Sequence, residues 1–118
     1  MGSREICKLN SSSGGLSGYD TAVGIYSIST SYQAINIGFV PDVLILTTHN
    51  GSSIVTTCYN ADVNSSKIYV GSSNGGYSTA NLHDTTKDFY FSSDMTTFYR
   101  KHTTATSTPG YWVALKQK

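Results

Sequence analysis

Serine, histidine and aspartate are the residues of this chain that could support nucleophilic chemistry. The sequence holds 18 serines, three histidines and six aspartates, and a hydrolase needs one of each within hydrogen-bonding reach. The one Gly-x-Ser-x-Gly run, residues 71–75, falls in a predicted polar loop and not in the strand-to-helix turn that exposes such a nucleophile. Glycoside cleavage needs two carboxyl groups, and the single glutamate, Glu5, lies in a polar N-terminal segment. The sequence therefore predicts a protein that is not an enzyme, and a small hydrolase is the least favoured alternative.

Two groupings contain residue types that bind metal ions. Asp62 lies near Asn64, and His83 and Asp84 lie near Asp88. Neither grouping has the ligand number or spacing of a known metal loop, so solvated turns explain them better. We expect no metal and no cofactor.

The aromatic residues are the main surplus with a functional meaning, because nine tyrosines and one tryptophan occur in 118 residues. Tyrosine offers a rigid apolar ring with a polar tip, which suits stacking on a sugar or packing in an oligomer interface. Tyr26 and Tyr90 alternate with other residues and are expected to cover sheet faces. Tyr59, Asn74 and Tyr77 flank loops rich in Asn, Asp and Gly, so we predict them as ligand-binding residues.

The elements that would position these residues are β-strands. Residues that favour strands (Val, Ile, Thr, Tyr, Phe, Trp) number 44 against 25 that favour helices (Ala, Leu, Glu, Lys, Gln, Arg, Met). Short apolar stretches recur between turn residues, a pattern typical of a sandwich or barrel. The predicted fold is all-β, an antiparallel β-sandwich of about eight strands, for which a jelly roll is one topology. The expected strands are residues 22–29, 32–39, 43–48, 54–59, 67–70, 87–91, 96–101 and 111–115, with 77–82 as a weak edge strand.

The chain divides into a short arm and one folded unit. Residues 1–18 end in a Ser- and Gly-rich run that can bury little surface, which predicts a flexible N-terminal arm or linker. Residues 19–118 form the predicted β-sandwich domain. Asn50-Gly51 indicates a tight hairpin between two of its strands, because this pair accepts the positive φ angles of such turns.

A corner is predicted where one strand ends and the next begins. Gly38 would let the chain bend or let a neighbour approach closely, and Phe39 would close the end of the core. Pro41 lacks an amide proton and so interrupts the ladder. We interpret all three residues as a structural motif.

The segment 33–46, which contains this corner, resembles small virion proteins of tailed bacteriophages and prophages, in which a strand ending in Gly-Phe-x-Pro leads into a Val/Ile-rich strand. Residues 110–115, Gly-Tyr-Trp-Val-Ala-Leu, are similar to the closing strand of tail-fibre and receptor-binding modules. The resemblance implies a homotrimer on the virion surface, assembled in the host cytoplasm, that contacts other virion proteins or the host. It carries no binding residues over to this chain.

The expected function is therefore host-surface adhesion or receptor binding by a phage fibre tip or head fibre, with a surface glycan as one receptor. The alternatives are a carbohydrate-binding module of a secreted bacterial protein and a purely structural virion decoration protein. The net charge of +1 and the absence of basic runs argue against nucleic acid as a partner. Since no apolar run approaches the roughly 20 residues that cross a bilayer, we expect no membrane association.

Cys7 and Cys58 are predicted not to bond to each other, because Cys7 lies in the polar arm and Cys58 in a strand. Alkylation of the non-reduced protein should therefore modify two thiols in the intact mass spectrum. A sample reduced before alkylation is the control for complete modification. An unmodified mass in the non-reduced sample would show a bond between them.

Overall fold

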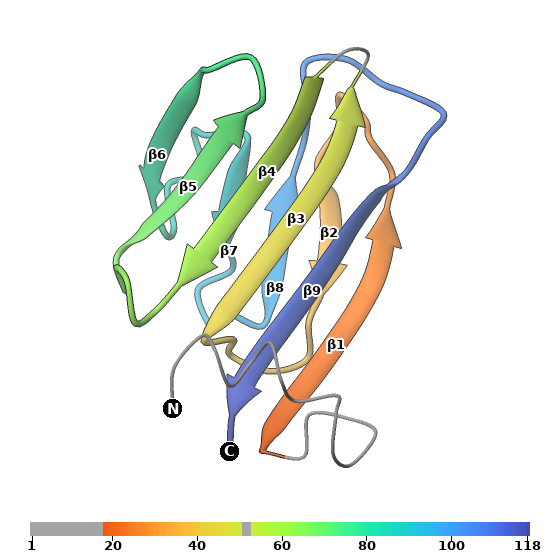
Figure 1. Cartoon of the computed structure of the whole chain (residues 1–118). Coiled ribbons are helices and arrows are strands. Elements are labelled where there is room, and N and C mark those ends of the chain that lie inside the picture. The colour runs from red at the N-terminus through yellow and green to blue at the C-terminus, as the bar shows by residue number, and fades with distance from the viewer. Residues whose placement is uncertain (1–17, 51–52) are drawn as a thin grey trace.

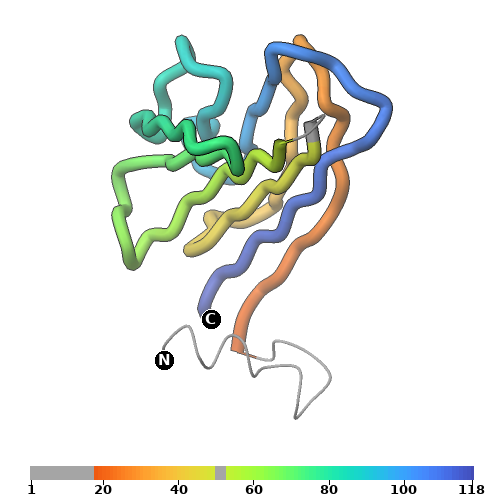
Figure 2. Tube along the Cα trace, turned by 45° about the horizontal axis from the view of Figure 1, so that its top comes forward, coloured from red at the N-terminus to blue at the C-terminus, as the bar shows by residue number. Residues whose placement is uncertain are grey.

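The computed structural model describes residues 18–50 and 53–118, which form nine strands in two antiparallel sheets. Figure 1 shows the larger sheet in front of the smaller one, and Figure 2 shows the two layers from another angle. The smaller sheet has the order β2 (Gln33–Asn36), β8 (Thr97–Arg100), β7 (Phe89–Phe91). The larger sheet has the order β1 (Tyr19–Tyr26), β9 (Gly110–Gln117), β3 (Val43–Asn50), β4 (Ser53–Asn60), β5 (Lys67–Ser72), β6 (Tyr77–Asn81).

The all-β prediction is confirmed, and the segment predicted as a weak edge strand is β6 at one edge of the larger sheet. The pairing of Asn50 with Ser53 confirms a hairpin between β3 and β4. β1 begins three residues earlier than predicted, and β2 is four residues long where eight were expected. The described residues include no helix that is long and apolar enough to cross a membrane.

The core lies between the two sheets and is built from alternate residues of their strands. Leu44 and Leu46 of β3 are almost fully buried, as are Phe91 of β7 and Phe98 of β8. The Phe91 and Phe98 rings meet edge to face at 4.9 Å between centroids. Burial of each such side chain stabilises the fold by roughly 1.5–3 kcal/mol, so these side chains hold the sheets together.

The corner between β2 and β3 depends on three residues predicted for it. Gly38 has a φ of 90°, which side chains other than glycine rarely adopt, and a Cβ there would meet no atom within 4 Å. Its role is therefore to bend the chain, not to admit a close neighbour. Phe39 is half-buried against the core, and Pro41 is fully buried. The amides of Ile37 and Gly38 both donate to the Thr96 carbonyl, which fixes the end of β2.

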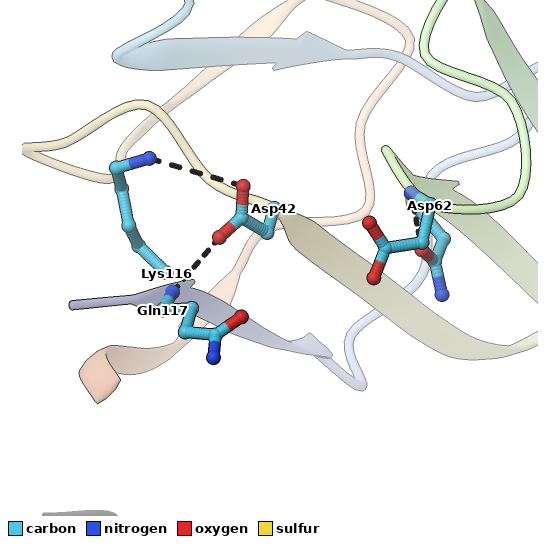
Figure 3. Close-up of polar contacts among 5 residues, drawn as sticks. Asp42, Asp62, Lys116 and Gln117 are labelled. Carbon is cyan, nitrogen blue, oxygen red and sulfur yellow. Dashed lines mark hydrogen bonds and ion pairs between the residues drawn. The ribbon is translucent and has the colours of Figure 1, made fainter. Parts of the chain in front are cut away.

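Asp42 joins this corner to the end of β9 (Figure 3). Its amide donates to the Leu115 carbonyl at 2.8 Å, and its Oδ2 accepts from the Gln117 amide at 2.8 Å. The Lys116 Nζ lies 3.8 Å from Oδ1 of the same carboxylate. The Asp42 carbonyl also accepts from the Ala61 amide at 2.8 Å. One residue thus holds β3, β9 and the segment after β4 at the same end of the sheet.

Two glycines allow large rings to lie flat on the inner face of β1 and β9. A Cβ at Gly110 would lie 2.7 Å from Cζ of Tyr26 and 3.0 Å from Cδ1 of Ile28. A Cβ at Gly24 would lie 2.7 Å from Nε1 of Trp112. The two 2.7 Å distances are shorter than real Cβ contacts, so these strands need glycine where the Tyr26 and Trp112 rings cross them.

Gly110→Ala should therefore lower stability by about 1–3 kcal/mol, because the added methyl group displaces the buried Tyr26 ring. We expect the melting temperature to fall by at least about 4 °C in a circular dichroism melt. Gly71→Ala in β5 is the matched control, since a Cβ there meets nothing within 4 Å. Equal melting temperatures for the two variants would contradict the close packing at Gly110.

Candidate functional site

An open pocket of about 650 Å³ lies beside the edge strand β6. It lies between the loop that joins β4 to β5 and the segment that follows β6. Its lining supplies two hydroxyls, an amide, an imidazole, a carboxylate and one apolar side chain. The lining residues are Ser65, Ser66, Asn81, Leu82, His83 and Asp84.

Side-chain caps shape the loop on one side of this pocket. The Asp62 amide donates to Asn60 Oδ1 at 3.0 Å, an interaction drawn in Figure 3. The Ser66 amide and hydroxyl both donate to Asn64 Oδ1, at 3.0 and 2.8 Å. Asn64 Nδ2 in turn donates to the Tyr69 hydroxyl at 3.2 Å. The Asn64 side chain, one of the candidate metal ligands, is thus engaged by Ser66 and Tyr69, whereas Asp62 uses its amide and not its carboxylate.

The opposite side of the pocket is fixed by His83, Asp84 and Asn81. His83 Nδ1 lies 3.1 Å from the Phe91 carbonyl oxygen; a carbonyl can only accept, so Nδ1 donates and Nε2 remains as an acceptor. Asp84 Oδ1 accepts from the amide and hydroxyl of Thr86, and these bonds lower the pKa of its carboxyl group. Lys67 Nζ donates to Asn81 Oδ1 at 2.6 Å. Neighbouring His83 and Asp84 are therefore held by different partners.

The two groupings considered for metal binding behave as turns in the structure. Asn64 and Asp84 both accept bonds from residues two positions later, the pattern of an Asx turn. Within residues 18–50 and 53–118, no three His, Cys, Asp or Glu side chains lie together in a way that could hold a metal ion.

The structure separates the three residues predicted to bind a ligand. Tyr59 is 5% exposed, and its ring meets the Phe91 ring edge to face at 5.2 Å. It is therefore a core residue whose ring faces cannot stack on a ligand. Tyr77 is 79% exposed, and Asn74 is exposed in the β5–β6 turn. Both lie near the β5–β6 turn, at the other end of β6 from the pocket.

The serine hydroxyls and the asparagine amide of the pocket were not predicted from the sequence as ligand-binding groups. Ser65, Ser66 and Asn81 belong to common polar residue types, and only the pairing of Lys67 with Asn81 brings their segments together. The one available signal was that two polar loops flank a predicted edge strand. Of the lining residues, His83 and Asp84 alone were considered, and then as metal ligands.

Other tyrosines cluster on the outer face of the smaller sheet. The Tyr90 and Tyr99 rings stack at 5.0 Å between centroids, and Tyr32 meets Tyr90 edge to face at 5.3 Å. Lys101 Nζ lies 4.6 Å from the centroid of the Tyr32 ring. The Tyr32 hydroxyl donates to the Lys87 carbonyl. These side chains cover one another, in agreement with the expectation that Tyr90 covers a sheet face.

A buried basic cluster lies between the sheets. Arg100 is 4% exposed, and its guanidinium donates to Thr57 Oγ1 at 3.1 Å and to the Lys101 carbonyl at 2.6 Å. Tyr26 Oη lies 3.3 Å from Nε2 of His102. Burial raises the pKa of Tyr26 to about 12. Burial, and then the Arg100 charge, lower the pKa of His102 to about 4.

This cluster predicts a pH dependence of stability. Because the pKa of His102 falls from 6.5 to about 4 on folding, the unfolded chain binds more protons between these values. The unfolding free energy is therefore greatest above about pH 6.5 and decreases toward pH 4, by up to roughly 3 kcal/mol. Nearby Asp88 opposes the shift and Arg100 supports it.

Urea unfolding at several pH values between about 7 and 4 measures this dependence. His102→Gln should flatten the slope relative to the unchanged chain, whatever its absolute stability. His49→Gln is the matched control, since His49 is exposed on β3. An unchanged slope in His102→Gln would show that His102 is not the group responsible.

The chain was compared with protein families, curated proteins and solved structures. No protein-family model matches the chain, and no curated protein or solved structure gives a significant match. The functional interpretation therefore depends on the pocket geometry and on the local resemblance of residues 33–46 and 110–115.

Proposed function

We propose that this chain is a non-enzymatic binding module that attaches a phage virion to a host surface, and that the pocket beside β6 takes a neutral sugar unit of a surface glycan. The observation that carries the proposal is the lining of that pocket. Residues with hydroxyl, amide, imidazole and carboxylate side chains line it together with Leu82. Such a set can donate to and accept from the hydroxyls of a sugar while one apolar side chain contacts its ring.

The size and charge of the pocket support this class of ligand. A volume of about 650 Å³ lies within the usual range of small-molecule sites. Asp84 is its one carboxylate, and the hydrogen bonds from Thr86 keep it ionised by lowering its pKa. Lys67 Nζ bonds Asn81, and the Lys87 charge acts on Asp84. Positive and negative charges therefore balance at the pocket and favour a neutral polyol over a charged group.

The bonding of His83 favours binding over hydrolysis. A catalytic histidine is oriented by a carboxylate and activates a hydroxyl. Here the Phe91 carbonyl engages Nδ1 of His83, Thr86 engages Asp84, and the Ser66 hydroxyl donates to Asn64. These groups are thus held as separate hydrogen-bonding groups that can contact a ligand from different sides.

The proposal includes a homotrimer at the virion surface, which the resemblance of residues 33–46 implies. A single open pocket with a few hydrogen bonds binds a sugar at about millimolar strength, or −4 kcal/mol. Several copies on one axis increase the apparent affinity through effective concentration, without any new contact. Adhesion by such a shallow site therefore benefits from a symmetric assembly.

A glycan array followed by titration calorimetry tests this function. His83→Ala and Asn81→Ala should each weaken glycan binding about fivefold, because each removes a hydrogen bond worth about 1 kcal/mol. Asn36→Ala is the matched control, since Asn36 is an exposed asparagine of the other sheet. Tyr77→Ala and Asn74→Ala test the other end of β6.

The outcomes distinguish the alternatives. Retention on bacterial envelope glycans supports host adhesion, whereas binding confined to free polysaccharides favours a carbohydrate-binding module of a secreted protein. No retention on any glycan favours a structural virion decoration protein. Binding that survives His83→Ala but is lost in Tyr77→Ala would place the ligand at the β5–β6 turn.

A further inference from the structure

The outer face of the larger sheet carries two rows of uncharged side chains that cross all six strands. Figure 1 looks onto this face, with the smaller sheet behind it. The strand registers align the rows from β1 through β9, β3, β4 and β5 to β6. One row is Val23, Val113, Ile45, Cys58, Tyr69 and Thr79, and the other is Ile25, Tyr111, Thr47, Thr56, Gly71 and Tyr77.

Exposed apolar side chains concentrate on this face. Eight large hydrophobic side chains are exposed in the described part of the chain, and six of them lie here. Val23 is 73% exposed on β1 at one edge, and Tyr77 is exposed on β6 at the other. The remaining two, Val40 and Val63, lie in loops. The six are Val23, Ile25, Ile54, Tyr69, Tyr77 and Tyr111.

The outer face of the smaller sheet is built differently. There Tyr90, Tyr99 and Tyr32 pack on one another, and Lys101 lies over the Tyr32 ring. None of these four side chains is among the exposed large hydrophobics. Within the described residues, one outer face is therefore covered by its own side chains, and no other segment covers the second.

The area of the outer face of the larger sheet suits a protein interface. With about 4.8 Å between strands and about 3.4 Å per residue, the six strands present a plane of roughly 700 Å². A standard stable interface takes about 800 Å² from each partner. Apolar patches on monomers are generally smaller than this plane.

We propose that this face is where copies of this chain meet, the aliphatic side chains of β1 and β9 in one copy packing on the tyrosines of β5 and β6 in the next. A second copy offers a partner surface of the same area, whose two central rows are uncharged and whose margin carries Lys67. The two halves of the face differ in their side chains. The half on β1 and β9 carries the aliphatic Val23, Ile25 and Val113, and the half on β5 and β6 carries the aromatic Tyr69 and Tyr77. A twofold axis along the strands places each half of one face on the unlike half of the other, so the whole face is used in one contact.

This interface joins two copies face to face, and it stands or fails separately from the homotrimer and the glycan binding of the proposed function. Light scattering after size exclusion should give the full-length chain a mass above the 12.7 kDa of one copy. Val23→Arg and Tyr77→Arg, one in each half, should weaken association at least about 100-fold, because each buries an unpaired charge. Val63→Arg is the matched control, since Val63 is 75% exposed in the β4–β5 loop.

Cys58 gives a second measurement, because it lies in the middle of one row. Its alkylation rate, followed by peptide mass spectrometry, should be slower in the unchanged chain than in Val23→Arg at the same concentration. Circular dichroism shows that each variant is folded. A single-copy mass for the unchanged chain at about 100 μM would overturn the inference, as would an unchanged assembly in both arginine variants. If the Val23→Arg variant has the mass of a single copy and still binds glycan, the glycan site is supported independently of the interface.

Discussion

The insertion of β9 between β1 and β3 is the constraint on which the larger sheet depends. Residues 110–117 pair with residues 19–26 on one side and with residues 43–47 on the other. Without β9, β1 would have no partner in this sheet. β9 lies far along the chain from both β1 and β3, and bringing such distant segments together costs chain entropy before any contact forms. We therefore expect the sheet to be completed late in folding. Asp42 bonds the end of β9, and Gly24 and Gly110 make room for the Trp112 and Tyr26 rings between β9 and β1.

The sequence predicted what depends on local pattern and missed what depends on distant pairing. The strands, the hairpin at Asn50 and the bend at Gly38 follow from residue type and spacing. The burial of Tyr59 did not, because residues 54–59 are apolar or hydroxyl-bearing at every position, so alternation cannot choose their inner face. For the same reason, the sequence did not show which residues form the two rows on the outer face of the larger sheet. The pocket beside β6 was missed because it needs the register of Lys67 with Asn81, which no local pattern encodes.

The buried basic cluster also restricts how the two sheets sit on each other. Arg100 of β8 donates to Thr57 of β4, so this bond crosses from the smaller sheet to the larger one. Its other acceptors are backbone carbonyls, and the guanidinium lies 5.4 Å from the Phe89 ring centroid. Burial lowers the pKa of both Arg100 and His102, which shows the cost of placing them there. Apolar packing alone tolerates small shifts between sheets, whereas a directional bond inside the core requires one position.

A symmetry axis that runs along the strands fits both the proposed interface and the proposed pocket. Packing the aliphatic half of one outer face on the aromatic half of the next requires an axis that runs along the strands. Such an axis keeps every copy pointing the same way, so all pockets lie at the same end of the assembly. An axis across the strands would instead pair like halves and send neighbouring pockets in opposite directions. The pocket is lined by residues of the loop before β5 and at and after the end of β6, next to the row that ends in Tyr69 and Thr79. Pockets that open in one direction at fixed spacing are the arrangement in which weak sugar contacts add as avidity.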